Sequence, residues 1–211
     1  ERYAQALLAA IPSGVERILD VGCGSGAMAE RLVTNGYQVD AVSPSDVLTR
    51  YARDKLGERA NIYHGKFEEV DLAPGYDLVL FSESFQYIPM ATALERAKGL
   101  LKPGGRILIC DFFKNDTEER GPLGGGHKYR RFPQACQDAG LEVAWDVDIT
   151  DGIAPTMDVF DDLAVNFLKP TWDLSGDLIS RRSPLVSRLL RRVFRKRLGK
   201  VNRKYFSRER N

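Results

Sequence analysis

The chain has 211 residues and a net charge of +2 at pH 7, and 43% of its residues are hydrophobic and 28% charged. This composition is typical of a globular protein and excludes a disordered or fibrous one, and no apolar run reaches the ~18 residues of a membrane-spanning helix. The three cysteines are odd in number and widely spaced, which predicts reduced thiols in the cytoplasm rather than a disulfide framework or a zinc site.

Short apolar segments alternate with segments of helical spacing along the first 150 residues. The expected strands are residues 17–21, 37–42, 61–64, 76–81, 106–111 and 141–149. The expected helices are residues 2–10, 27–34, 45–56, 91–101 and 130–139. Such alternation is typical of βαβ units. Residues 1–150 therefore predict an α/β fold, with a doubly wound, mostly parallel sheet covered by helices on both faces.

Residues 151–211 follow a different pattern. Residues 157–168 have helical spacing, and residues 183–204 predict an amphipathic basic helix that begins at Ser183-Pro184. No convincing seventh strand follows the sixth. We expect a helical insertion or cap in the same domain unit, with a further strand outside this sequence; a sheet that closes differently is the alternative.

The near-neutral total charge hides an uneven distribution. Residues 181–211 hold 13 Lys or Arg and one acid, so this end carries +12 while the remaining residues carry −10. Three interpretations of the basic helix stay open. It packs on the acidic body as a solvated helix, it lies on an anionic membrane surface, or it binds RNA or another polyanion.

The segment 17–21 runs into Gly22-Cys23-Gly24-Ser25-Gly26, after which a helix is expected. Glycines let the backbone turn tightly and approach a ligand closely, and a helix N-terminus offers unpaired N–H groups. In a doubly wound sheet, ligands bind in this crevice at the carboxyl ends of the strands. Gly22, Gly24 and Ala27 also satisfy the dinucleotide pattern G-x-G-x-x-G/A, which is weak evidence by itself.

The fuller run ILDVGCGSG, residues 18–26, resembles motif I of the class I (Rossmann-like) S-adenosylmethionine (SAM) methyltransferases. The run LLKPGGRILI, residues 100–109, resembles that family's turn before strand five, and residues 77–82 stand as strand four between them. The resemblance covers residues 11–149. It implies the family's fold, SAM as cofactor and S-adenosylhomocysteine (SAH) as product.

The resemblance also implies cofactor-binding residues. They are Asp20, Gly22, Cys23, Gly24, Gly26, Ser43, Pro44, Ser45, Lys66, Phe67, Ser82 and Gln86. At the end of strand two the family usually has an acid that binds the ribose hydroxyls. Here Ser43 stands at that position, Asp46 is a substitute nearby, and Asp40 is too far back along the strand. Lys66 stands where the family often has an acid near the adenine, and Phe67 is expected on the adenine side.

The segment after strand four, residues 82–88, should form part of the acceptor site. It lacks [DNS]-P-P-[YF], the signature of transferases that act on amino groups of nucleobases or glutamine. Glu83 is a candidate catalytic acid because it follows a strand at its carboxyl end. Tyr87 is a second catalytic candidate, and Tyr87 and Gln86 are expected to contact SAM or the substrate.

The two histidines differ in their expected roles. His127 follows three glycines in the loop 114–128, a place suited to covering a site, and an imidazole pKa near 6.5 suits a general base. His64 ends a strand and is expected to be structural or near the adenine. Neither the histidines nor the cysteines have the spacing of metal ligands, so no metal is expected.

The sequence therefore predicts a SAM-dependent methyltransferase with a small-molecule or lipid-like acceptor, acting by O- or C-methylation. The expected location is cytoplasmic, with peripheral membrane contact if residues 183–204 bind anionic lipid. An RNA acceptor is the close alternative. An NAD(P)-dependent oxidoreductase and a SAM-fold protein that binds without catalysing are the alternatives from other classes.

Overall fold

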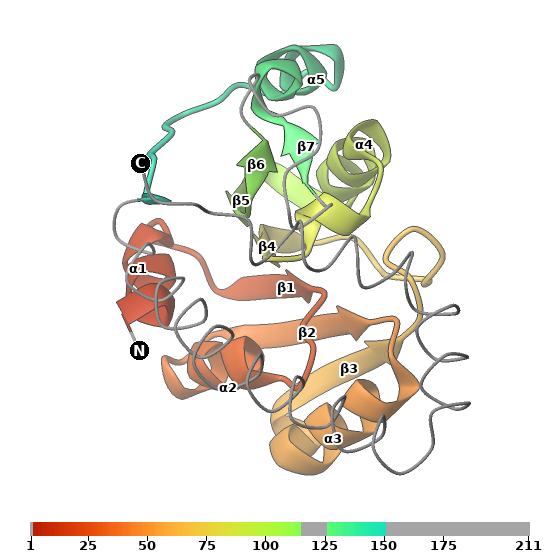
Figure 1. Ribbon diagram of the computed structural model, residues 1–211. Helices are drawn as coiled ribbons and strands as arrows, with labels where there is room; N and C mark the ends of the chain where they lie inside the picture. Colours follow the sequence, from red (N-terminus) through yellow and green to blue (C-terminus); the bar gives the residue numbers. More distant parts are fainter. Residues whose placement is uncertain (1, 115–125, 151–211) are drawn as a thin grey trace, which may run out of the picture. The chain divides into compact units, whose positions relative to one another are not determined.

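The computed structural model describes residues 2–114 and 126–150 of the chain (Figure 1). By their contacts the residues divide into two units, Glu1–Val143 and Ala144–Asn211. Every element and site discussed below lies in the first unit. The segments 157–168 and 183–204, for which helices are expected, lie outside the described residues, so the cap and the basic helix remain predictions.

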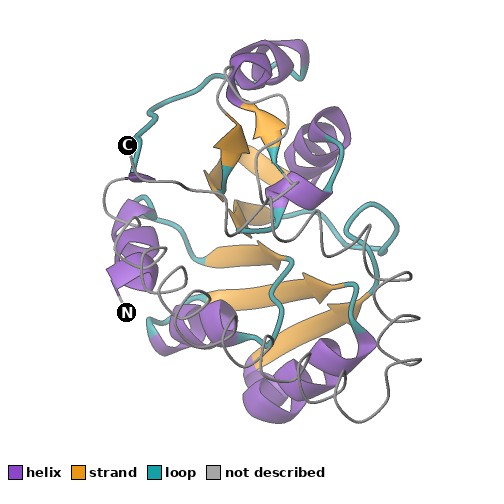
Figure 2. Cartoon of the chain, in the orientation of Figure 1, coloured by secondary structure: helices purple, strands orange, loops and turns teal. Residues whose placement is uncertain are grey.

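Five parallel strands form the central sheet, in the order β3-β2-β1-β4-β5 (Figure 2). They are β1 (Arg17–Val21), β2 (Gln38–Ser43), β3 (Ala60–His64), β4 (Tyr76–Ser82) and β5 (Leu101–Cys110). The strand order reverses between β1 and β4. Ligands of open α/β sheets bind at such a switch point, outside the carboxyl ends of the strands, and the glycine loop follows β1 there.

Five α-helices accompany the sheet: α1 (Arg2–Ala10), α2 (Ala27–Thr34), α3 (Asp46–Leu56), α4 (Met90–Leu100) and α5 (Phe132–Asp138). Side chains alternate between the two faces along β1, so Ile18 packs with α1, α2 and α3, whereas Leu19 packs with α4 and α5. Helices therefore cover both faces, and the predicted doubly wound α/β fold is confirmed. Short 3-10 turns lie at η1 (Gly57–Arg59), η2 (Phe85–Tyr87) and η3 (Tyr129–Arg131).

Local sequence explains where α2 and α3 begin and end. Ser45 caps α3, because its hydroxyl accepts a hydrogen bond from the Leu48 N–H at 3.4 Å. Asn35 ends α2, and Gly36 follows with φ +92°, a left-handed conformation that glycine adopts without strain.

The predicted sixth strand, residues 141–149, is wrong. This segment is described and contains no strand, and Val143, Trp145, Val147 and Ile149 are 40–59% exposed. Its alternating apolar pattern is typical of a half-buried strand, but a strand also needs a partner for its backbone N–H and C=O groups. The described sheet ends at β5, and no described strand pairs with this segment.

Two further differences concern the region around β5. The strand begins at Leu101 rather than at residue 106, with an irregular register beside Tyr76 and Leu78. The segment expected as a loop from 114 to 128 contributes to a small parallel pair, β6 (Phe113–Lys114) with β7 (His127–Lys128). This pair brings His127 beside the strand that follows β5.

A buried carboxylate on β2 connects four of the strands of the sheet. Asp40 on β2 is 3% exposed and accepts three hydrogen bonds of 2.7 Å, from Arg17 Nη2, Tyr76 Oη and Asn61 Nδ2. Burial alone would raise the pKa of Asp40, but these donors outweigh it and the net direction is down. Since the donors come from β1, β3 and β4, one carboxylate links four neighbouring strands.

Candidate cofactor and active site

The glycine loop is held against β2 by its own backbone. The N–H groups of Gly22 and Cys23 both donate to the Val42 carbonyl, at 2.8 and 3.0 Å, and the Gly26 N–H donates to the Cys23 carbonyl at 2.9 Å. Gly22 has φ +78°, and a Cβ there would lie 2.4 Å from Ser84 Cβ. Glycine is therefore required at position 22 by both the turn and the packing.

Gly24 differs from Gly22 in what surrounds it. It has φ +55°, but a Cβ built on it would meet no atom within 4 Å among the described residues. The loop thus presents open space at this glycine, where a ligand can approach the backbone closely. This openness fits the role that the sequence predicts for Gly24.

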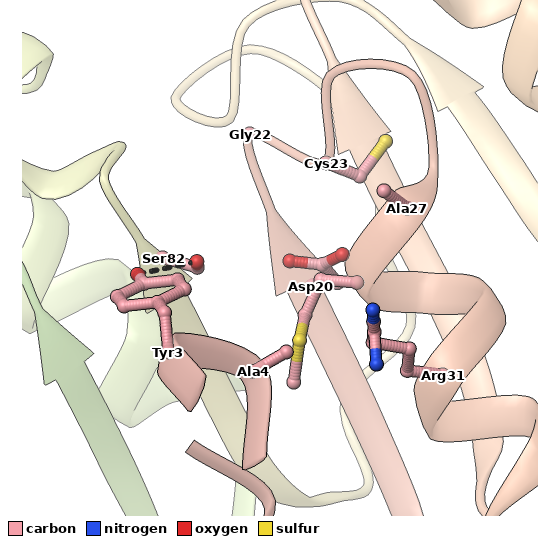
Figure 3. A pocket seen from close by; sticks show the side chains of 9 residues that line it. Tyr3, Ala4, Asp20, Gly22, Cys23, Ala27, Arg31 and Ser82 are labelled. Atoms are coloured by element: carbon pink, nitrogen blue, oxygen red, sulfur yellow. Dashed lines mark hydrogen bonds between the residues drawn. The ribbon is translucent and has the colours of Figure 1, made fainter. Parts of the chain in front are cut away.

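A pocket of about 230 Å³ opens beside the loop (Figure 3). It is enclosed by α1, the end of β1, the glycine loop, α2 and the last residue of β4. The lining residues are Tyr3, Ala4, Asp20, Gly22, Cys23, Ala27, Met28, Arg31 and Ser82. Four of the predicted cofactor residues, Asp20, Gly22, Cys23 and Ser82, therefore line one pocket.

Asp20 is the most unusual group in this pocket. It is 1% exposed, and its Oδ2 has no hydrogen-bond partner among the described residues. Burial raises the pKa of Asp20 from 3.8 to about 7. Buried polar atoms in folded proteins nearly always have a partner, so an unpartnered carboxylate oxygen on a residue that lines a pocket favours a cationic or hydrogen-donating ligand there.

Helix α1 is tied to the pocket by Tyr3. Its hydroxyl lies 2.8 Å from Ser82 Oγ at the end of β4, and burial raises the pKa of Tyr3 well above its usual value. Burial likewise raises the pKa of the Cys23 thiol to about 12, so this cysteine is not a thiolate nucleophile at neutral pH. Tyr3 and Ser82 thus form one wall of the pocket and Cys23 part of another.

The turn after β2 is built largely from local contacts. Ser43 is 1% exposed, its Oγ accepts from the Ser45 N–H at 3.4 Å, and its carbonyl accepts from the Gly65 N–H at 3.0 Å. Pro44 is exposed, and Asp46 is also exposed and forms an ion pair with Arg50 at 2.9 Å. The Ser43 hydroxyl therefore lies inside the turn, and the role of this turn toward a ribose stays a prediction.

The two residues predicted on the adenine side, Lys66 and Phe67, have different surroundings. Lys66 is exposed and pairs with Glu69 at 2.9 Å. Phe67 is 3% exposed and packs edge-on against Phe81, with 5.6 Å between ring centroids. Phe67 therefore contributes to the hydrophobic core between β4 and α4, and Lys66 lies on the surface beside it.

The segment after β4 has a strained backbone at its start. Glu83 is exposed and has φ +58°, and it is the one described residue other than glycine with a positive φ. Its N–H donates to the Cys110 carbonyl at 2.9 Å, which fixes this conformation. Strain of this kind persists where the surroundings impose it, and it concentrates at functional sites.

The next residues form η2, which is held by Asp111 from the end of β5. One Asp111 oxygen accepts from the Gln86 N–H at 3.0 Å and the other from the Phe112 N–H at 2.7 Å. Burial raises the pKa of Asp111. Tyr87 is 78% exposed, so it contributes no packing to the described core.

His127 holds the same turn by a second set of contacts. Its Nε2 lies 3.1 Å from the Phe85 carbonyl and 2.9 Å from the Ile88 carbonyl, and its ring packs edge-on against Phe85. Carbonyl oxygens only accept hydrogen bonds, so Nε2 carries a hydrogen and donates it. His127 thus positions the segment after β4, and a base at this residue would have to use Nδ1.

Sequence reasoning missed several residues of the site. Tyr3, Met28 and Arg31 line the pocket, and Asp111 orders the turn after β4. Asp111 could have been found, because it follows a strand at the carboxyl edge of the sheet, where ligands of this fold bind. Tyr3 carries no comparable signal, since only the packing of α1 against α2 brings it to the glycine loop, whereas Arg31 lies one turn into the helix that follows this loop.

The described part of the chain contains neither a metal-binding cluster nor a membrane-spanning helix. Residues 2–114 and 126–150 contain no group of three or more His, Cys, Asp or Glu arranged to hold a metal ion. Within the same residues, no helix has the length and apolar character to cross a membrane. Cys23, Cys110 and Cys136 are free thiols.

Residues 19–109 match the family model of a methyltransferase domain. An uncharacterised methyltransferase of Geobacillus sp. (strain WCH70) is 26% identical over 136 residues, which are 63% of this chain and 64% of the relative. A ubiquinone biosynthesis O-methyltransferase of Xanthomonas euvesicatoria pv. vesicatoria (strain 85-10) is 36% identical over 99 residues, 44% of this chain and 41% of the relative. The chain thus spans less than two thirds of either relative.

Among solved structures, a geranyl diphosphate C-methyltransferase from Streptomyces coelicolor A3(2) has the same fold. It superimposes with a TM-score of 0.65 at 18% sequence identity and covers 71% of this chain and 62% of that one. Residues 19–109, which match the family model, contain the glycine loop and the switch point between β1 and β4. Residues 19–109 thus match a methyltransferase domain, and the fold is that of the class I (Rossmann-like) SAM-dependent methyltransferases.

Proposed function

We propose that this chain binds SAM and transfers its methyl group to a small-molecule or lipid-like acceptor, by O- or C-methylation. The observation that carries the proposal is the buried, unpartnered carboxylate oxygen of Asp20 in a pocket beside an open glycine loop. The relative named for O-methylation in ubiquinone biosynthesis supports an acceptor of this kind. The segment 183–204 lies outside the described residues, so membrane contact through it stays a prediction.

The pocket fits the charges of SAM. The methionine end of SAM carries an ammonium group, and an ammonium supplies both the hydrogen and the positive charge that Asp20 Oδ2 lacks. Gly24 leaves room beside the backbone for the rest of the cofactor. When bound, SAM would supply a methyl group activated by a positively charged sulfur: an oxygen or carbon of the acceptor would bond to the methyl carbon as the bond from that carbon to sulfur breaks, and SAH would be the leaving group.

The described residues can contribute mainly by position. Holding the acceptor in line with the methyl group is itself a large source of rate acceleration. His127 and Asp111 both hold the turn 85–88, which gives the acceptor side a rigid wall. Glu83 is exposed at the start of that wall, where it could accept the proton that an O-methylated acceptor loses.

The raised pKa of Asp20 predicts a pH dependence of cofactor binding. The bound ammonium needs the carboxylate ionised, but with a pKa of about 7 most of the free protein carries protonated Asp20 at pH 6. The Kd for SAH should therefore be about 5- to 10-fold higher at pH 6 than at pH 7.5. Calorimetric titrations at both pH values measure this, and equal affinity or tighter binding at pH 6 would contradict it.

Gly24→Val is expected to weaken SAH binding at least ~100-fold, because its side chain fills the space where the ligand approaches the loop. Gly14→Val is the matched control. Gly14 also has a positive φ, +83°, with no atom near its Cβ, but it lies before β1 and away from the pocket. Both variants should lose roughly 1–2 kcal/mol of stability from the left-handed backbone. Wild-type affinity in Gly24→Val would place the ligand elsewhere.

An activity screen tests the transfer itself. The full chain is incubated with SAM labelled in its methyl group and with separate pools of phenolic small molecules, lipids and RNA. The proposal predicts label in the small-molecule or lipid pool. Label in RNA alone would overturn the proposed acceptor class and leave the methyltransferase activity standing. Label in none of the pools, with SAH binding intact, would favour a protein that binds SAM without catalysing.

A further inference from the structure

The pocket contains a second charged group that the site described so far does not use. Arg31 lies one helical turn into α2 after Ala27, and both side chains line the pocket with Asp20. Figure 3 shows the Asp20 carboxylate between Tyr3 and Ser82 on one side and Arg31 on the other. An acidic side chain from β1 and a basic side chain from α2 therefore line the same pocket.

Several other arginines of the described residues are held by carboxylates or carbonyls. Arg17 and Arg50 bind the carboxylates of Asp40 and Asp46, and Arg53 donates to the Ile62 carbonyl at 2.8 Å. Over residues 2–114 and 126–150, no ion pair within 4.0 Å involves Arg31. Arg31 is half-buried and lines the pocket.

Asp20 and Arg31 do not neutralise each other either. Their charged atoms form no ion pair, and Asp20 Oδ2 has no hydrogen-bond partner in the described part of the chain. An acidic and a basic side chain that line the same pocket without pairing can bind a ligand that carries one positive and one negative group. An α-amino acid has an ammonium and a carboxylate on one carbon, and guanidinium is the group best suited to bind a carboxylate.

We propose that Arg31 binds the α-carboxylate at the methionine end of the cofactor while Asp20 binds its α-ammonium. This inference rests on the proposed function, since it assigns the cofactor's amino-acid end to the pocket of Asp20. It makes Arg31 a determinant of cofactor specificity. The pair selects a ligand with an intact amino acid over one that keeps only the adenosine and thioether.

The test compares Arg31→Gln with wild type in calorimetric titrations of two ligands, SAH and decarboxylated SAH. Arg31→Gln is expected to weaken SAH binding about 10- to 100-fold, the usual worth of a hydrogen bond to a charged group. The same variant should bind decarboxylated SAH within about twofold of wild type, because that ligand has no carboxylate. Arg31→Lys keeps the positive charge and should lose less SAH affinity than Arg31→Gln.

Arg106→Gln is the matched control. Arg106 is exposed on β5 and pairs in register with Leu78, at the end of the strands opposite to the pocket, so its loss should leave both affinities unchanged. Equal SAH affinity in Arg31→Gln and wild type, or an equal loss for both ligands, would overturn the assignment of Arg31. Failure of the wild type to bind SAH at all would instead contradict the proposed function.

Discussion

Asp20→Asn is expected to weaken SAH binding about 100-fold and at the same time to stabilise the free protein at pH 8. The variant keeps the shape of the side chain but removes its charge. Truncating one partner of a buried, charge-assisted pair usually costs about 2–5 kcal/mol of binding, which corresponds to a factor of 30 or more. The loss arises because the cofactor's ammonium would then be buried against a neutral amide.

Asp20→Asn weakens binding but stabilises the free protein, because wild-type Asp20 is a buried carboxylate without a partner when no cofactor is bound. Burial raises the pKa of Asp20 from 3.8 to about 7, so the folded state holds the proton more tightly than the unfolded state. Wild-type stability therefore falls as the pH rises from about 4 to about 7, by at most ~4 kcal/mol for a shift of three units. The asparagine amide is buried too, so the expected gain at pH 8 is about 1–3 kcal/mol.

Urea denaturation at pH 8 and pH 4.5 measures this effect. The gain should be present at pH 8 and nearly absent at pH 4.5, where Asp20 is protonated in the folded state. Asp54→Asn, on the exposed side of α3, is the control and should change neither stability nor SAH affinity. An Asp20→Asn protein that is less stable than wild type at pH 8, or that binds SAH normally, would remove Asp20 from the cofactor site.

Asp40→Ala should lower the free energy of unfolding by about 3–5 kcal/mol. The change leaves Arg17, Tyr76 and Asn61 without the acceptor that each reaches at 2.7 Å, and breaking a buried ion pair on one side has this cost. Because the four residues come from four neighbouring strands, the loss affects β1, β2, β3 and β4 together.

The control for this experiment is Asp46→Ala. Asp46 also pairs with an arginine, Arg50 at 2.9 Å, but both side chains are about two thirds exposed. Water and salt screen such a pair, so the expected loss is below about 1 kcal/mol. Urea denaturation of both variants gives the comparison, and equal losses would show that the Asp40 network does not hold the strands together.

The five strands of the sheet and the glycine loop were predictable because the sequence signals them locally. Apolar segments at 17–21 and 76–81 are short, and glycines 22, 24 and 26 can form a turn that other residues cannot. The sixth strand was mispredicted for a related reason. Residues 141–149 have the alternation of a strand, but pattern alone does not show whether a neighbouring edge is available for pairing.

The pocket was only half predictable. Asp20, Gly22, Cys23 and Ser82 lie in or next to motifs that can be recognised in the sequence. Tyr3 reaches the same pocket only because α1 packs on α2, a contact between helices that no local pattern encodes. The pocket is formed by the acidic part of the chain, because the basic residues 181–211 lie outside the described residues that form it.

Calorimetric titration of the wild-type chain with SAH, and separately with NADH, tests the central claim most directly. The Asp20 pocket and the glycine loop predict saturable binding of SAH with one site per chain and no binding of NADH. No heat of binding at millimolar SAH, together with tight binding of NADH, would contradict the assignment of SAM as cofactor and favour an oxidoreductase.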